Sequence, residues 1–204
     1  MKKIYSSYKD LPRLTEKGFE KIKIPSKIWE PLKQMYLTLK QLPPEKEIED
    51  SGMLKNSIIY PMWQLDALVE QVHNDLIPIF EWWCKESLEV TVRYGLRSYF
   101  KGAILKKHKD WINTHHVSSI MVLDKNLDGK KDWPLQFQDH NGLWHDIYLN
   151  PGDMLLYESA TCEHGREVPF QGKNYVNCYF HSRLKSWDFL PVESRFNRWN
   201  KDWD

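Results

Sequence analysis

A change in the spacing of apolar residues near residue 88 constrains the fold more than any other feature. Before it, apolar residues recur at intervals of three and four over about residues 25–42 and 61–86, which predicts two amphipathic helices. After it, short runs alternate apolar and polar residues, as half-buried strands do. Strands are expected over about residues 88–94, 98–105, 117–123, 135–138, 143–149, 153–157 and 174–182. Many short strands separated by turn signals favour a sandwich or barrel over alternating strands and helices.

These patterns predict one domain over residues 1–204, mainly β with flanking helices, in the α+β class. We expect a helical support region (1–88), a jelly-roll or double-stranded β-helix core (89–187) and a C-terminal tail (188–204). The charged stretch 45–55 is expected to be a loop. The helices would then pack on the outside of the jelly roll.

Composition argues against several classes of partner and location. The net charge of +1 does not favour nucleic acid or an anionic membrane. No apolar run approaches the roughly 18–20 residues that span a bilayer. Residues 1–5 lack the apolar region of a signal peptide. Cys84, Cys162 and Cys178 are widely spaced, which indicates free thiols in a reducing cytoplasm rather than a disulfide framework.

Two histidines and one carboxylate form the strongest candidate for a chemical site. His108 and Asp110 are two positions apart, so in a strand they point to the same face, and His164 follows 54 residues after Asp110. This is the ligand set of non-haem Fe(II) oxygenases, whereas zinc prefers a four-coordinate tetrahedral site. A chain with eight histidines can also contain this spacing by chance. His115 and His116 would point to opposite faces and are expected in a polar loop near the site entrance.

The residues around these histidines resemble a known family. Residues 99–110 (YFKGAILKKHKD) resemble the YxxGxxLxxHxD pattern of the prolyl 4-hydroxylase-like 2-oxoglutarate- and Fe(II)-dependent dioxygenases. Residues 152–157 are similar to the turn and strand that precede that family's distal histidine. Residues 164–173 are similar to its segment from that histidine to a basic residue, and residues 175–181 to its closing strand. The resemblance covers roughly residues 90–185.

The resemblance implies an iron centre that also holds 2-oxoglutarate. His108, Asp110 and His164 would be the catalytic iron ligands, and O2 would take an open position on the metal. Lys173 would pair with the distal carboxylate of the co-substrate, and Tyr99 would contribute a hydroxyl hydrogen bond. Ascorbate is a candidate reductant for the iron.

Two positions depart from the family pattern. Many relatives have arginine where this chain has Lys173, and a lysine fixes the orientation of a carboxylate less firmly than the guanidinium fork does. Taken alone, Lys173 is typical of a solvated turn lysine. Many relatives also carry a tyrosine where Val122 aligns, so another group would have to supply that hydroxyl.

Alternation along the last strand extends the candidate site. If Lys173 points into the barrel, then Asn177 and Tyr179 do so as well. Asn177 is thus a candidate for co-substrate binding and Tyr179 for substrate binding, with core packing as the alternative for both. Arg97 and Arg166 are further candidates for substrate contacts, and a strand arginine is also a common surface residue.

The function implied by the resemblance is hydroxylation of a C–H bond, with 2-oxoglutarate converted to succinate and CO2. A peptidyl proline hydroxylated at C4 is the expected substrate, with a free amino acid or another small molecule as the alternative. A cupin-like metal-binding protein without oxygenase activity is the competing class, and the near-neutral charge argues against a nucleic-acid demethylase. Loops at 111–117 and 124–133 are expected to lie over the site.

Overall fold

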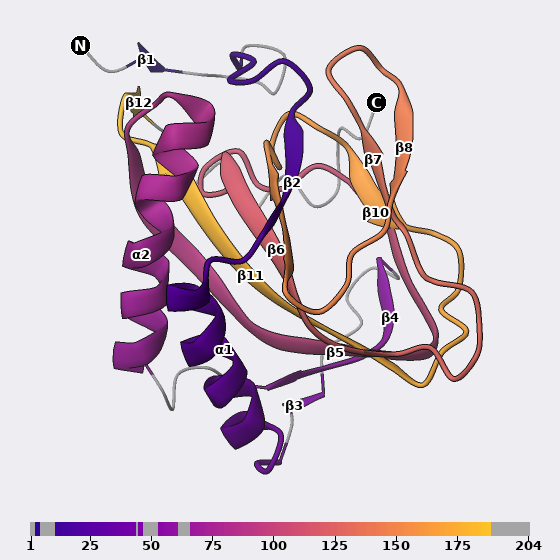
Figure 1. Cartoon of the computed structure of the whole chain (residues 1–204). Coiled ribbons are helices and arrows are strands. Elements are labelled where there is room, and N and C mark those ends of the chain that lie inside the picture. The colour runs from indigo at the N-terminus through magenta and orange to yellow at the C-terminus, as the bar shows by residue number, and fades with distance from the viewer. Residues whose placement is uncertain (1–2, 5–10, 44, 47–52, 61–65, 189–204) are drawn as a thin grey trace.

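The computed structural model describes residues 3–4, 11–43, 45–46, 53–60 and 66–188. The elements in chain order are β1 (Lys3–Ile4), β2 (Phe19–Lys23), α1 (Ser26–Leu39), β3 (Glu45–Lys46), β4 (Leu54–Tyr60), α2 (Asp66–Cys84), β5 (Leu88–His108), β6 (Val117–Asn126), β7 (Leu135–Gln138), β8 (Trp144–Ile147), β9 (Asp153–Tyr157), β10 (His164–Arg166), β11 (Asn174–Leu184) and β12 (Trp187–Asp188). The main sheet is antiparallel and curls into a jelly roll, with both helices against one outer face (Figure 1). The expected fold class is confirmed.

Both predicted helices form. Helix α1 buries Ile28, Leu32, Met35 and Leu39, which recur at the spacing of one helix face. Helix α2 continues through Pro78. Five residues of the predicted second helix, 61–65, lie outside the described residues, as do residues 189–204 of the expected tail. No helix of the described residues is long and apolar enough to cross a membrane.

The strand predictions are correct for most of the sheet, but they omit β10, which lies between β5 and β7, and the short strands before residue 88. Two predicted strands, 88–94 and 98–105, are one long strand, β5. The region before residue 88 is not only helical, because β2 pairs with β9 and β4 pairs with β5. The expected loop at 45–55 contains β3 and the first residues of β4. These short strands gain their order from the strands beside them, which local spacing does not reveal.

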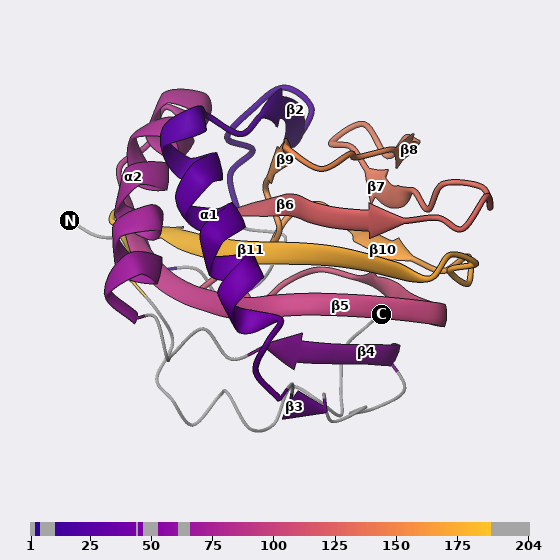
Figure 2. The ribbon, with the colours of Figure 1, turned by 60° about the horizontal axis from the view of Figure 1, so that its bottom comes forward.

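The sheet separates two apolar cores. The strand order is β2-β9-β6-β11-β5-β10-β7-β8, and successive side chains of a strand point to opposite faces. In β6, Met121 and Leu123 join the core under the helices, whereas Ile120 and Val122 join the core inside the jelly roll. Figure 2 shows the helices on one side of β6, β11 and β5. The inner core forms the wall of the candidate site.

Candidate metal centre

The pairing of β5 with β10 brings the two predicted metal-binding histidines together. His164 lies opposite His108 in the antiparallel register, and their ring centroids are 4.6 Å apart. Asp110 follows β5 and places Oδ1 3.3 Å from Nε2 of His108 and 3.8 Å from Nε2 of His164. The three residues offer ligand atoms that all lie within 4.8 Å of one another. The structure therefore assembles the triad that the sequence predicts.

Hydrogen bonds orient both imidazoles toward the same point. Nδ1 of His108 donates to the carbonyl of Lys106 at 2.8 Å, and Nδ1 of His164 donates to the carbonyl of Cys162 at 3.1 Å. Because a carbonyl can only accept, each Nδ1 carries a proton, which leaves Nε2 as the atom that a metal would bind. Burial alone would lower the pKa of His108, but its contacts with Asp110 raise it. Metal-binding histidines typically donate their other ring N–H in this way, which fixes the orientation of the ring.

The electrostatics of the triad suit a divalent cation. Burial lowers the pKa of His164 to about 4, so its imidazole is neutral at pH 7. Burial alone would raise the pKa of Asp110, but His164, His108 and His115 together hold it well below its usual range, and the carboxylate is ionised. Its Oδ2 atom is buried and has no hydrogen-bond partner among the described residues. A metal ion fits this donor set, because it would bind the imidazole lone pairs and compensate the buried carboxylate.

A second pair of histidines contacts Asp110 from the other side. Asp110, His115 and His181 also place ligand atoms within 4.8 Å of one another. The rings of His115 and His181 are 3.9 Å apart, and Nδ1 of His181 is 2.6 Å from Oγ of Ser118 and 3.9 Å from Oδ2 of Asp110. The expectation that His115 lies in a polar entrance loop is wrong, because its side chain is buried beside the triad. The alternation that selects Asn177 also reaches His181 and could have identified it.

The remaining candidates on β5 and β11 form a polar cluster inside the jelly roll. The hydroxyls of Tyr99 and Tyr179 are 2.8 Å apart, and the amide of Asn177 donates to Tyr179 at 3.0 Å. The Arg97 guanidinium lies 5.2 Å from the ring of Tyr179 and 6.0 Å from that of Tyr99. Oδ1 of Asn177 is buried without a hydrogen-bond partner among the described residues. The cluster thus has an acceptor left for a ligand.

Neither family models nor curated proteins match this chain, whereas solved structures do. HygX from Streptomyces hygroscopicus, with nickel, 2-oxoglutarate and hygromycin B bound, is 15% identical with a TM-score of 0.62, over 89% of this chain and 90% of that one. EctD from S. alaskensis, with 2-oxoglutarate and 5-hydroxyectoine, is 12% identical with a TM-score of 0.57, over 83% and 73%. A Pseudomonas putida prolyl-4-hydroxylase is 14% identical with a TM-score of 0.50, over 82% and 94%.

The chain has the fold of the 2-oxoglutarate/Fe(II) oxygenases. Within this oxygenase fold, one expected orientation is wrong. Lys173 lies in a bend before β11 and its side chain is exposed, so the alternation of β11 does not extend to it. Arg166, two residues after His164 on β10, is instead buried and only 2% exposed.

The predicted loops differ from expectation at one end. Residues 124–126 belong to β6, so the loop expected at 124–133 is shorter.

Val122, where many family members carry a tyrosine, is buried in the inner core and lies beside Asn177 in register. The ring of Tyr157 lies 4.9 Å from that of His164 and is fully buried. Tyr157 therefore brings an aromatic hydroxyl side chain to the same wall from another strand.

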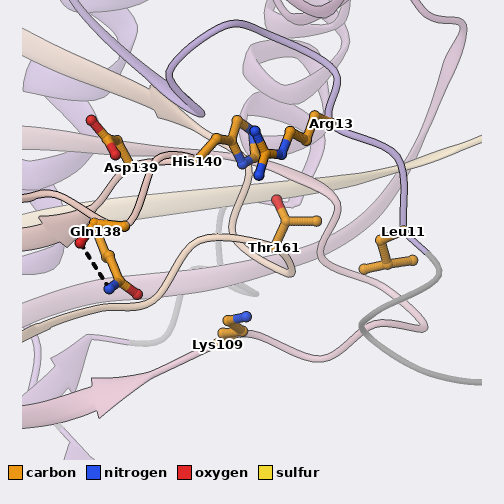
Figure 3. Close-up of a pocket in the computed structure, with 8 residues that line it drawn as sticks. Leu11, Arg13, Lys109, Gln138, Asp139, His140 and Thr161 are labelled. Atoms are coloured by element: carbon orange, nitrogen blue, oxygen red, sulfur yellow. Dashed lines mark hydrogen bonds between the residues drawn. The ribbon is translucent and has the colours of Figure 1, made fainter.

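A separate polar cavity of about 270 Å³ is lined by eight residues (Figure 3). Lys109, which lies between the candidate ligands His108 and Asp110 just after the end of β5, is one of the lining residues. The other lining residues are Leu11, Arg13, Gln138, Asp139, His140, Gly142 and Thr161. None of the three predicted metal ligands is among them, so this cavity is distinct from the metal centre.

Proposed function

We propose that this protein is a 2-oxoglutarate- and Fe(II)-dependent dioxygenase that hydroxylates a C–H bond. The observation that carries the proposal is the triad itself. Two imidazoles aim their Nε2 atoms at one ionised carboxylate, which is buried and has an oxygen atom without a partner among the described residues. Three ligands on one side of a metal leave positions open for a co-substrate and O2.

The residues present fit this pair of cofactors. His108, Asp110 and His164 would hold the iron, and the hydroxyl of Tyr99 and an amide N–H of Asn177 would donate hydrogen bonds to the co-substrate. When bound, iron and 2-oxoglutarate supply the oxidising chemistry that inserts an oxygen atom from O2 into a C–H bond, with release of succinate and CO2. The chain's own contribution is to orient the ligands and to exclude water with its inner apolar core.

For the substrate, we propose a peptidyl proline hydroxylated at C4. The side chains of His108 and Asp110 are 14% and 15% exposed, whereas that of His164 is 4% exposed, so the centre opens on the side of the first two. Trp111 follows Asp110 directly and leaves 40% of its surface exposed, which offers an aromatic face to a proline ring. A Pseudomonas putida prolyl-4-hydroxylase shares the fold.

A small molecule is the alternative substrate. HygX was crystallised with hygromycin B and EctD with 5-hydroxyectoine, and both share the fold of this chain. Fold alone does not choose between these classes. We also propose a cytoplasmic location, because Cys84, Cys162 and Cys178 are free and buried, which fits a reducing compartment.

The test is Fe(II)-dependent formation of succinate from 2-oxoglutarate in the presence of O2 and ascorbate. Asp110→Asn should reduce both Fe(II) binding and succinate formation by at least about 100-fold, because it removes the only charged ligand. Asp139→Asn is the matched control, since that carboxylate also lies 2.8 Å from a histidine, His145, but outside the metal centre. Metal binding without any succinate would instead support a metal-binding jelly roll that is not an oxygenase.

The substrate class needs its own experiment. A library of proline-containing peptides is incubated with the loaded protein, and mass spectrometry looks for the gain of one oxygen atom on proline. Hydroxyproline in a subset of sequences supports the peptidyl substrate. Unmodified peptides together with succinate formation on a panel of small molecules would contradict it.

A further inference from the structure

A cation is buried inside the jelly roll with part of its charge uncompensated. Arg166 is 2% exposed, and among the described residues its Nη2 atom has no hydrogen-bond partner and its guanidinium has no salt bridge. Nη1 donates to the carbonyl of Trp133, and the guanidinium lies 4.5 Å from the ring of Trp133 and 4.7 Å from that of Tyr175. Burying a charge is costly unless an opposite charge pairs with it, so this site is suited to an anion.

We infer that Arg166, rather than Lys173, pairs with the distal carboxylate of the bound 2-oxo dicarboxylate. This inference rests on the proposed function, because it assumes that the other end of the same ligand is held by the metal. The guanidinium fork matches a carboxylate with two parallel hydrogen bonds, and Nη2 is a donor without a partner among the described residues. Aromatic rings beside the guanidinium keep water away from the pair.

The position of Arg166 relative to the triad supports this assignment. His164 lies beside the rings of Phe137 and Tyr157, and Arg166 beside those of Trp133 and Tyr175, so both side chains point into the inner core. The two residues are two positions apart on β10, where the pairing with β5 shifts its register, and their Cα atoms are about 6.6 Å apart at the usual rise of a strand. This is the separation that a five-carbon dicarboxylate can bridge when one end is at the metal. A Cβ on Gly165 would lie 2.8 Å from the backbone of Lys107, so β10 is tightly packed on β5 between the two side chains.

Lys173 does not meet the same requirements. Its side chain is exposed, and its backbone N–H donates to the carbonyl of Asn126 at 2.8 Å in the bend before β11. An exposed ammonium is well hydrated and gains little from a carboxylate. The basic residue at the end of the family-like segment is therefore not the buried cation of this chain.

The test follows the logic of a double-mutant cycle: it combines a substitution in the protein with the removal of one group from the ligand. Binding of 2-oxoglutarate and of 2-oxopentanoate, which lacks the distal carboxylate, is measured by calorimetry on the Mn(II)-loaded protein without O2. The wild type should bind 2-oxoglutarate at least about 30-fold more tightly, because losing one partner of a buried charge pair costs about 2 kcal/mol or more. Arg166→Met should reduce this ratio to within about threefold, and Lys173→Met should leave it unchanged.

A purely structural role for Arg166 would weaken both ligands equally and keep the ratio. An unchanged ratio in Arg166→Met, or its loss in Lys173→Met, overturns the inference. Arg166→Lys keeps a charge and should retain part of the preference, so it decides the question if the methionine variant does not fold. If the metal-loaded wild type binds neither 2-oxo acid, the proposed function has failed; binding by the wild type with no effect of Arg166 refutes only the inference.

Discussion

At the scale of single residues, the carboxylate of Asp110 occupies the middle of the centre. Imidazoles lie on both sides of its carboxylate, with Oδ1 facing His108 and His164 and Oδ2 facing His181. Nδ1 of His181 also lies 2.6 Å from Oγ of Ser118, whereas 3.9 Å separates it from Oδ2 of Asp110, so the serine orients the imidazole beside the carboxylate without a hydrogen bond between those two groups. We expect His181 to be a positioning residue for the metal-binding carboxylate rather than a ligand.

Replacing His181 should therefore weaken the metal without removing a ligand. We predict that His181→Phe lowers Mn(II) affinity by about 10–100-fold, the usual effect of losing a residue that supports a ligand. Calorimetric titration of the metal-free protein with Mn(II) measures this directly. His145→Phe is the control, because it removes a histidine that pairs with Asp139 away from the centre. Equal affinities in the two variants would contradict the positioning role.

At the scale of elements, the contact between β10 and β5 determines whether the triad can form. Gly165 allows this contact, because a Cβ there would lie 2.8 Å from N and Cα of Lys107 and 2.9 Å from the carbonyl of Leu105. All of these are backbone atoms, which cannot move aside as a flexible side chain could. The two histidines are aligned only while the strands stay at this distance.

A methyl group at this position should therefore disturb both stability and metal binding. We predict that Gly165→Ala lowers the free energy of unfolding by about 1–3 kcal/mol, as overpacking does, and lowers Mn(II) affinity as well. Urea unfolding and metal titration measure the two effects. Gly129→Ala is the matched control, since a Cβ there meets nothing within 4 Å and only its positive φ of 70° adds strain. A Gly165 variant that behaves like the Gly129 variant would show that the strands can separate freely.

Elements also show what could be predicted from the sequence and what could not. The long strands and the pair of His108 and Asp110 were predictable, because alternation and the HxD spacing are local properties of the chain. The short strand β10, which brings His164 opposite His108, has no such local pattern. The edge strands β2 and β4 were not, since their order comes from β9 and β5. The exposure of Lys173 and the burial of Arg166 were also hidden, because alternation holds only inside a strand and Lys173 lies in a bend. The position of His115 depends on how residues 111–116 turn back toward the triad.

At the scale of the whole molecule, two cores share one sheet, and the outer core contains buried histidines. His73 on α2 packs against Phe180, and His116 packs against Trp187. Burial lowers the pKa of His73 to about 4 and that of His116 to about 3. The folded chain therefore keeps both neutral over a pH range in which the unfolded chain protonates them. Each contributes stability that is complete above pH 6.5 and is lost as the pH falls toward the folded pKa.

We predict that the metal-free protein loses about 2 kcal/mol of stability per buried histidine between pH 7 and pH 5, because each unfolded imidazole gains a proton there. Urea unfolding at the two pH values measures the loss. His73→Phe should make the loss of stability between pH 7 and pH 5 smaller by about that amount, because phenylalanine does not titrate in the folded or the unfolded chain. Stability that is equal at both pH values would show that the folded chain protonates these rings without cost.

The buried guanidinium of Arg166 is an unfavourable feature of the ligand-free protein, because no salt bridge from the described residues neutralises its charge. Selection for ligand binding and selection for a stable core therefore favour different residues at position 166. We predict that Arg166→Met, in the absence of ligand, melts at a higher temperature than the wild type, as replacements of poorly compensated buried charges often do. Differential scanning calorimetry measures this, and a lower melting temperature would contradict it. A more stable protein that has lost its ligand would identify the arginine as kept for binding at the expense of stability.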